Sequence, residues 1–188
     1  MHIPKGPATD VLVVTQFLLW LGLLLAGRQE WAFTQLGFVP GLIGEAFASG
    51  NVGVMAEAVI ARPIAAAFLH AGFLHMLFNA LFLLFVGRFV EGAMGTRSFL
   101  VLYGASLLAA AFADYIADPS SMIVSVGASG AIAGIIAAYM LIYARIGGKP
   151  WGPIPAKWAR RLTLLAIWLF ITLALGMTSN GGGTMTTI

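Results

Sequence analysis

Two apolar segments of the sequence carry polar side chains that could do chemistry. His75 and Asn79 are four residues apart in the segment over 64–86, and Ser129 lies in the segment over 123–143. A spacing of four places His75 and Asn79 on one face of a helix. A serine hydroxyl is a nucleophile, and imidazole and carboxamide groups donate hydrogen bonds that stabilise negative charge. Together these residue types indicate a site for nucleophilic chemistry.

A polar side chain in a membrane segment costs free energy unless it is paired or faces water, so each of these residues is a functional candidate. The structural alternative is a hydrogen bond that joins two helices of a bundle. At a rise of about 1.5 Å per residue, His75 lies ~16 Å and Ser129 ~9 Å from the expected helix starts. The three groups could therefore meet in the outer half of a membrane.

His70 is another polar residue of the first segment. It precedes His75 by five residues, about 140° around a helix, so the two imidazoles should not share a face well. A histidine pair at this spacing is a poor metal site, unlike a pair four residues apart. The chain has no cysteine, and few carboxylates lie near these histidines. We therefore expect neither a metal ion nor another cofactor.

Small residues surround Ser129 in the sequence. Gly127 precedes it and Gly130 follows it, and such residues let the backbone approach a substrate and leave N–H groups free as donors. The soluble-hydrolase pattern Gly-x-Ser-x-Gly is excluded, because Ala131 stands where that pattern needs glycine. Gly130 and Gly134 also predict a small-residue face on which another helix packs closely.

The composition is typical of a membrane protein. Of the 188 residues, 60% are apolar and 9% are charged, whereas soluble domains are about 45–50% apolar and about 25% charged. This composition excludes a disordered chain, a nucleic-acid-binding domain and an ordinary soluble enzyme. Five membrane spans would take roughly 100 residues and leave room only for short loops. We predict an all-α bundle of five membrane helices that forms one domain over residues 1–188.

The apolar segments predict where these helices lie, with a long outer loop over 28–62 between the first and the second. This loop should contain short helices at the membrane interface. The first helix could instead be the apolar part of a signal peptide, because 24–27 resembles a weak cleavage site. The helices are predicted over 11–26, 64–86, 99–116, 123–143 and 162–177.

The distribution of lysine and arginine predicts the orientation. With a cytoplasmic N-terminus, only Arg28 and Arg62 of the 10 cations lie outside. Cytoplasmic loops of membrane proteins hold most of their lysine and arginine. We therefore expect an integral, multi-pass protein of a bacterial inner membrane, with its N-terminus in the cytoplasm. The cations expected inside are Lys5, Arg88, Arg97, Arg145, Lys149, Lys157, Arg160 and Arg161.

These motifs give the chain a resemblance to a known family. The sequence HAGFLHMLFN at 70–79 and the sequence GASG at 127–130 resemble those of the rhomboid intramembrane serine proteases. Arg62 resembles an arginine of the family's first loop, and Glu91 with Gly95 resembles its E-x-x-x-G motif. The resemblance covers nearly the whole chain and implies a rhomboid-like fold, whose family core has six helices.

The resemblance also implies a role for each matching residue. Ser129 would be the nucleophile, and its backbone N–H would be one donor of the oxyanion hole. His75 and Asn79 would be the side-chain donors. His70 would support the site near a water-accessible cavity. The other supporting positions implied by the resemblance are Gly127, Gly130, Arg62, Glu91 and Gly95.

The implied substrate is the membrane helix of another protein, unwound locally so that a carbonyl can be reached. The expected partners are therefore transmembrane protein substrates and membrane lipid, with no nucleic acid and no metal. Two other classes stay open. One is an inactive pseudoprotease that binds membrane helices without cutting them, and the other is a small transporter whose polar residues line a pore.

The sequence departs from the family at the general base. Rhomboid proteases pair the serine with a histidine on a sixth core helix, but no histidine follows Ser129 here. We expect a truncated chain that lacks this helix; the alternatives are a pseudoprotease, or His75 or His70 as the base. Two alanines also depart from the family. Many members have tryptophan at the position of Ala61 and an aromatic residue at the position of Ala133.

Overall fold

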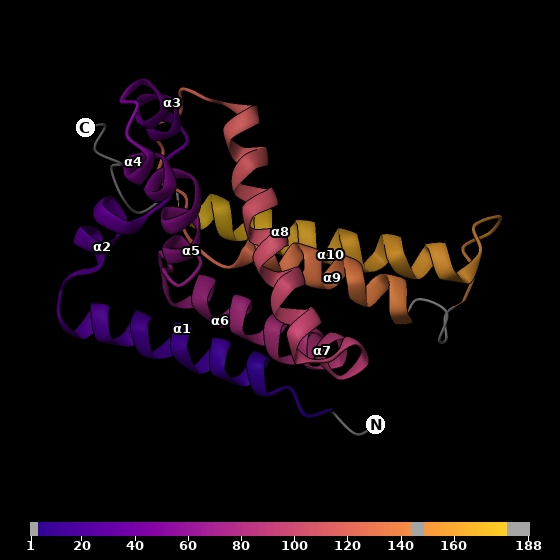
Figure 1. Ribbon diagram of the computed structural model, residues 1–188. Helices are drawn as coiled ribbons and strands as arrows, with labels where there is room; N and C mark the ends of the chain where they lie inside the picture. The colour runs from indigo at the N-terminus through magenta and orange to yellow at the C-terminus, as the bar shows by residue number, and fades with distance from the viewer. Residues whose placement is uncertain (1–3, 144–148, 180–188) are drawn as a thin grey trace.

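The computed structural model describes residues 4–143 and 149–179, and helices account for most of them (Figure 1). One long helix is followed by several short ones: α1 (Pro7–Leu25), α2 (Gln29–Leu36), α3 (Gly41–Ala48), α4 (Val52–Ala56), η1 (Glu57–Ala61) and α5 (Arg62–Ala66). The rest comprises α6 (Phe73–Phe82), η2 (Leu83–Gly87), α7 (Arg88–Met94), α8 (Thr96–Ala117), α9 (Ser129–Tyr143) and α10 (Ala156–Ser179).

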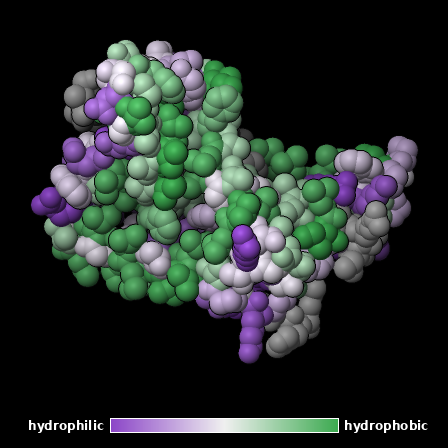
Figure 2. All heavy atoms as spheres, in the orientation of Figure 1, coloured by the Kyte–Doolittle hydropathy of each residue, from purple (hydrophilic) through white to green (hydrophobic). Residues whose placement is uncertain are grey.

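Within these described ranges, three helices are long and apolar enough to cross a membrane. They are α1, the continuous helix Phe73–Met94 formed by α6, η2 and α7, and α8. α9 is a shorter apolar helix. Apolar side chains cover most of the face shown in Figure 2, and hydrophilic side chains gather near α2–α4 and near the start of α10. The predicted all-α membrane bundle is confirmed.

Two predicted helices begin later than the sequence suggested. The helix predicted over 64–86 is interrupted, because α5 ends at Ala66 and α6 begins only at Phe73. The helix predicted over 123–143 begins at Ser129, because the residues before it form hydrogen bonds with the outer loop. Both breaks lie in apolar sequence, and a short apolar segment is compatible with helical and with extended backbone.

The other predicted helices differ from the structure only at their ends. α8 covers the whole of 99–116, α1 begins four residues before position 11, and α10 begins six residues before position 162. The outer loop over 28–62 contains short helices, as predicted. The position of those helices at a membrane interface stays a prediction.

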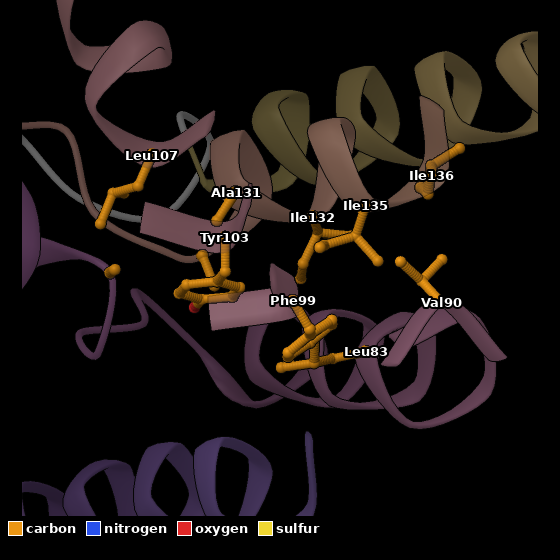
Figure 3. Packing of buried hydrophobic residues seen from close by; sticks show 11 residues of the cluster. Leu83, Val90, Phe99, Tyr103, Leu107, Ala131, Ile132, Ile135 and Ile136 are labelled. Carbon is orange, nitrogen blue, oxygen red and sulfur yellow. The ribbon is translucent and has the colours of Figure 1, made fainter. Parts of the chain in front are cut away.

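The hydrophobic core forms where α8 and α9 meet the continuous helix of α6, η2 and α7. Figure 3 shows Phe99 and Tyr103 of α8 with Leu83 of η2 and Ile135 of α9. α1 packs beside this core and adds a polar contact, because the Gln16 amide donates to the Tyr103 hydroxyl at 3.2 Å. This buried contact joins α1 to α8.

α8 and α9 lie very close together because glycines of α9 face small residues of α8. A Cβ atom at Gly134 would collide with the Ser106 side chain, and one at Gly130 would collide with Ala110. The small-residue face predicted from Gly130 and Gly134 is therefore confirmed. Close packing of this kind is a main source of helix association in membranes, and here it sets the position of the first turn of α9.

The carboxylate of Glu91 joins the start of α1 to the end of α7. It is buried and accepts hydrogen bonds from the Ala8 N–H at 3.0 Å, the Thr9 N–H at 2.9 Å, and the Thr9 and Thr96 hydroxyls at 2.8 Å. The first N–H groups of a helix have no acceptor within it, and the helix dipole favours an anion there. Glu91 therefore acts as the cap of α1 from a distant part of the chain.

Replacing Gly134 by alanine should force α8 and α9 apart, because the methyl group would overlap Ser106. We expect the free energy of unfolding to fall by about 1–3 kcal/mol, the usual cost of overpacking. Adding Ser106→Gly should restore part of the loss. Thermal unfolding in detergent, followed by tryptophan fluorescence, measures both effects. The control is Gly104→Ala on α8, where a Cβ atom meets nothing within 4 Å, and equal unfolding temperatures for Gly134→Ala and Gly104→Ala would contradict the contact.

Replacing Glu91 by glutamine should loosen α1, because the amide is neutral and turns an NH₂ group toward N–H and O–H donors. We expect a loss of about 1.5–3 kcal/mol in the free energy of unfolding, the range for hydrogen bonds to charged groups. The same unfolding assay measures it, with the exposed Glu45→Gln on α3 as the control. An unfolding temperature that matches the control would show that the cap contributes nothing.

Candidate active site

Ser129 is the first residue of α9 and is half-buried. An early hydrogen bond of this helix runs from the Ile132 N–H to the Ala128 carbonyl at 2.9 Å. N–H groups in the first turn of a helix have no acceptor within the helix. The N–H groups of Ser129 and Gly130 therefore lie where they can donate to an incoming group.

Gly127 brings the His75 ring to the start of α9. A Cβ atom at Gly127 would lie 2.7 Å from both Cε1 and Nε2 of His75, so the imidazole rests directly on the Gly127 backbone. The φ angle of Gly127 is +110°, a conformation that residues with a side chain rarely adopt. Glycine is needed here for both reasons, and the imidazole contacts the chain two residues before Ser129.

The expectation that His70 and His75 lie on different faces of one helix is wrong. His70 lies in the turn between α5 and α6, so helical spacing does not apply to the pair. The two rings meet edge to face, with their centroids 5.2 Å apart. His70 is 1% exposed, whereas His75 is half-buried. His70 therefore supports the His75 ring from the interior, and His75 has the more accessible position.

Asn79 lies one turn after His75 on α6 and is 5% exposed. One N–H of its carboxamide donates to the His75 carbonyl at 2.8 Å. A carboxamide has two N–H donors, so this bond fixes the side chain and leaves a second donor. The structure thus holds His75 and Asn79 together, and the Gly127 contact brings the pair to the turn that precedes Ser129.

Backbone hydrogen bonds fix the segment that leads into α9. Phe38 and Ser125 form an isolated antiparallel bridge, with N–H to carbonyl distances of 3.1 and 2.8 Å. The Gly127 N–H donates to the carbonyl of Ala66, the last residue of α5, at 2.8 Å. The outer loop and the end of α5 therefore both position the turn before Ser129.

Arg62 stabilises the outer loop rather than the reacting groups. Its Nη1 donates to the Gly37 carbonyl at 3.2 Å, and its Nε pairs with Glu57 Oε1 at 3.3 Å. Gly37 directly precedes Phe38, which pairs with the segment before α9. Arg62 thus acts on the site only through the backbone, and Glu91 and Gly95 lie at the distant junction of α1, α7 and α8.

The arrangement can stabilise negative charge next to a serine hydroxyl. The hydrogen-bond donors gathered around this turn are the N–H groups at the start of α9, the His75 imidazole and the carboxamide of Asn79, and donors of these kinds can form an oxyanion hole. Among the described residues, no three His, Cys, Asp or Glu side chains gather closely enough to hold a metal ion. The histidines of the described part are His70 and His75, and both belong to this cluster.

Two features of the site could not be seen in the helical pattern. One is the turn that places His70 behind His75, and the other is the contact between His75 and Gly127. The signals available were Gly72 and Gly127, because a glycine inside an apolar segment often marks a break or a close approach of another group. The pattern identified the residue types, but it did not identify which of them are in contact.

The fold and the site define a polytopic membrane protein whose serine, histidine and asparagine side chains come from two apolar helices. Residues 57–186 match the model of the Rhomboid domain family. The chain belongs to the rhomboid family.

Curated relatives support this assignment. The chain is 30% identical over 138 residues to the protein named "Putative rhomboid protease YdcA" of Bacillus subtilis (strain 168). This match covers 72% of this chain and 62% of that protein. It is 33% identical over 97 residues to Rhomboid protease GluP of the same organism, covering 52% of this chain and 18% of GluP. The match to RHOMBOID-like protein 5 of Arabidopsis thaliana is 35% identical over 79 residues, covering 42% of this chain and 26% of that protein.

The chain spans less than two thirds of the length of each of these relatives. No significant match was found among solved structures.

Replacing Gly127 by alanine should destabilise the turn before Ser129, because the methyl group would overlap the His75 ring and φ is positive. We expect a loss of about 1–3 kcal/mol in the free energy of unfolding. Adding His75→Ala should recover the steric part of this loss but not the backbone part. Gly72→Ala is the control in the same unfolding assay, because its φ of −172° suits any residue and a Cβ atom there meets nothing within 4 Å.

The double variant decides whether the contact exists. If Gly127→Ala costs as much stability in the His75→Ala background as in the wild type, the imidazole does not rest on Gly127.

Proposed function

We propose that this protein is an intramembrane serine endopeptidase that cleaves the membrane helices of other proteins. The observation that carries the proposal is the contact of the His75 imidazole with Gly127, two residues before Ser129. It brings an oxyanion donor to the turn that begins the serine-bearing helix. Membership of a family with relatives named as proteases supports the same function.

In the proposed reaction, Ser129 Oγ attacks the scissile carbonyl carbon while a base takes its proton. The carbonyl oxygen becomes negatively charged and accepts hydrogen bonds from the Ser129 N–H, the His75 imidazole and Asn79. Loss of one such donor costs about 2.7–4 kcal/mol of transition-state stabilisation in serine proteases. The peptide bond then breaks, the amine leaves with that proton, and water hydrolyses the acyl-enzyme to release the acid and restore Ser129. The substrate helix must unwind locally, because the carbonyls of an intact helix are already hydrogen-bonded.

This attack needs a general base, and the family resemblance implies a histidine of a sixth core helix in that role. A serine hydroxyl needs a base to become an effective nucleophile. His75 cannot easily accept the proton of Ser129 and donate to the oxyanion at once. His70 is almost fully buried and lies against His75, which makes it a poor alternative.

An inactive family member that binds membrane helices is the second candidate. The observation that favours it is that, of the two histidines in the described part, His75 is assigned to the oxyanion and His70 is buried behind it, so neither is available as a separate base. Such a protein would use the same helices to hold a substrate helix without cutting it.

We also propose that the start of α1 faces the cytoplasm, in a bacterial inner membrane. α7, which begins at Arg88, and the start of α10 lie toward one side of the molecule, whereas α2 and α5 lie toward the other (Figure 1). The first side holds most of the cations, and the second holds Arg28 and Arg62. This separation supports the orientation expected from the preference of cations for the cytoplasmic side.

Ser129→Ala should abolish covalent labelling by a fluorophosphonate and cleavage of a transmembrane substrate, because it removes the nucleophile. The protein is expressed in membranes and assayed by gel fluorescence and by mass spectrometry of the labelled peptide. Ser125→Ala is the matched control, because that hydroxyl lies four residues earlier and donates to Asp114 at 2.7 Å. We expect the control to label and cleave at close to the wild-type rate.

Labelling that persists in Ser129→Ala would overturn the assignment of the nucleophile. A folded wild-type protein that binds transmembrane helices but never labels would overturn the protease proposal and favour the inactive binder.

A further inference from the structure

A cluster of exposed cations and tryptophans lies at the start of α10. We call it the basic turn and define it by Lys149, Trp151, Lys157, Trp158 and Arg161. All of these residues are exposed except Arg161, which is half-buried. None of them belongs to the proposed active site, and their exposure has no explanation in the packing of the bundle.

The backbone presents these side chains in a defined arrangement. Trp151 and Ile154 exchange two N–H to carbonyl hydrogen bonds of 3.0 Å around Gly152, whose φ of +54° permits the tight turn. The Arg161 guanidinium lies 4.8 Å from the centre of the Trp158 ring. One turn of helix separates Lys157 from Arg161, so two cations and an indole are neighbours on α10.

The basic turn has no acidic side chain near it in the sequence. The chain contains no Asp or Glu after Asp118, and Glu57 and Asp10 pair instead with Arg62 and Arg88. Like charges four residues apart on a helix repel one another. An anion from outside the chain would therefore be attracted to the basic turn and would relieve this repulsion.

The lipid headgroups of the membrane are the anions that fit the basic turn best. α10 continues from these cations into apolar sequence, beginning at Leu162, where the sequence predicts a membrane helix over 162–177. Tryptophan is enriched at the level of the lipid headgroups, and Trp151 and Trp158 are 53% and 48% exposed. Clusters of lysine and arginine beside a membrane helix attract anionic headgroups.

We propose that the basic turn binds the phosphate groups of anionic phospholipids and so anchors the start of α10 at the membrane surface. Lys157 and Arg161 contact the phosphate, Lys149 adds charge from the preceding turn, and the two indoles pack among the glycerol and upper acyl groups. The partner is a lipid of the surrounding bilayer rather than a soluble polyanion, because the indoles need an apolar phase beside the charge.

The chain contains a matched site that should lack this property. Arg28 lies 4.7 Å from the centre of the Trp31 ring, which repeats the pairing of Arg161 with Trp158. Glu30 stands between them in the sequence, and no other cation lies nearby along the chain. A cation stacked on tryptophan is thus present at both places, but an excess of positive charge is present only in the basic turn.

The test is native mass spectrometry of the purified protein in detergent, with added phosphatidylglycerol or phosphatidylcholine of the same acyl chains. We expect the wild type to retain phosphatidylglycerol at least tenfold more strongly. The variant Lys149→Gln/Lys157→Gln/Arg161→Gln should lose this preference, at about fivefold per charge removed. Arg28→Gln and the charge-conserving Lys157→Arg should keep it. Circular dichroism and size-exclusion chromatography check folding, and the single variant Lys157→Gln gives a milder test.

Equal retention of the two lipids by the wild type would overturn the proposal, as would a preference that survives in the triple variant. Inorganic phosphate that displaces phosphatidylglycerol at equal concentration would also overturn it, because the basic turn would then be a site for free phosphate. Each result is independent of protease activity, so it is separate from the test of Ser129.

Discussion

The close backbone contact between α8 and α9 is the constraint on which the site depends. Gly130 and Gly134 leave no room for a side chain between these helices, and in a membrane such contact replaces the hydrophobic driving force that water would supply. Because Ser129 directly precedes Gly130, the same contact that joins the helices also fixes the place of the hydroxyl. A packing motif and the Ser129 hydroxyl thus occupy one turn of α9. Small residues in this turn are compatible with close helix packing and with the approach of a substrate.

Different interactions secure the two ends of the bundle. At the end that carries the site, backbone hydrogen bonds join the outer loop and α5 to the turn that contains Gly127, and Arg62 adds an ion pair with Glu57 in the outer loop. At the other end, charged side chains hold α1 and α7 together. The Glu91 carboxylate caps α1, and Arg88 pairs with Asp10 at 2.7 Å. Charged side chains cost less free energy near lipid headgroups and water, which solvate any charge that has no partner in the protein.

The sequence predicts the fold class and the family of this protein better than the course of its backbone. The all-α membrane bundle follows from composition, and the close packing at Gly134 follows from the spacing of small residues. The breaks before Phe73 and Ser129 do not follow, because hydrogen bonds between distant segments create them and apolar pattern does not record such bonds. His70 shows the consequence, since a helical wheel separates it from His75 while the actual turn brings the rings into contact.

The central claim is that the Ser129 hydroxyl and the His75 imidazole face the same reacting carbonyl. An experimental structure of the protein in lipid, after reaction with a fluorophosphonate, tests it most directly. We expect phosphorus bonded to Ser129 Oγ. We also expect the phosphoryl oxygen about 2.7–3.1 Å from the Ser129 backbone nitrogen and from a ring nitrogen of His75. An adduct on another residue, or a phosphoryl oxygen directed away from His75 and Asn79, would contradict it.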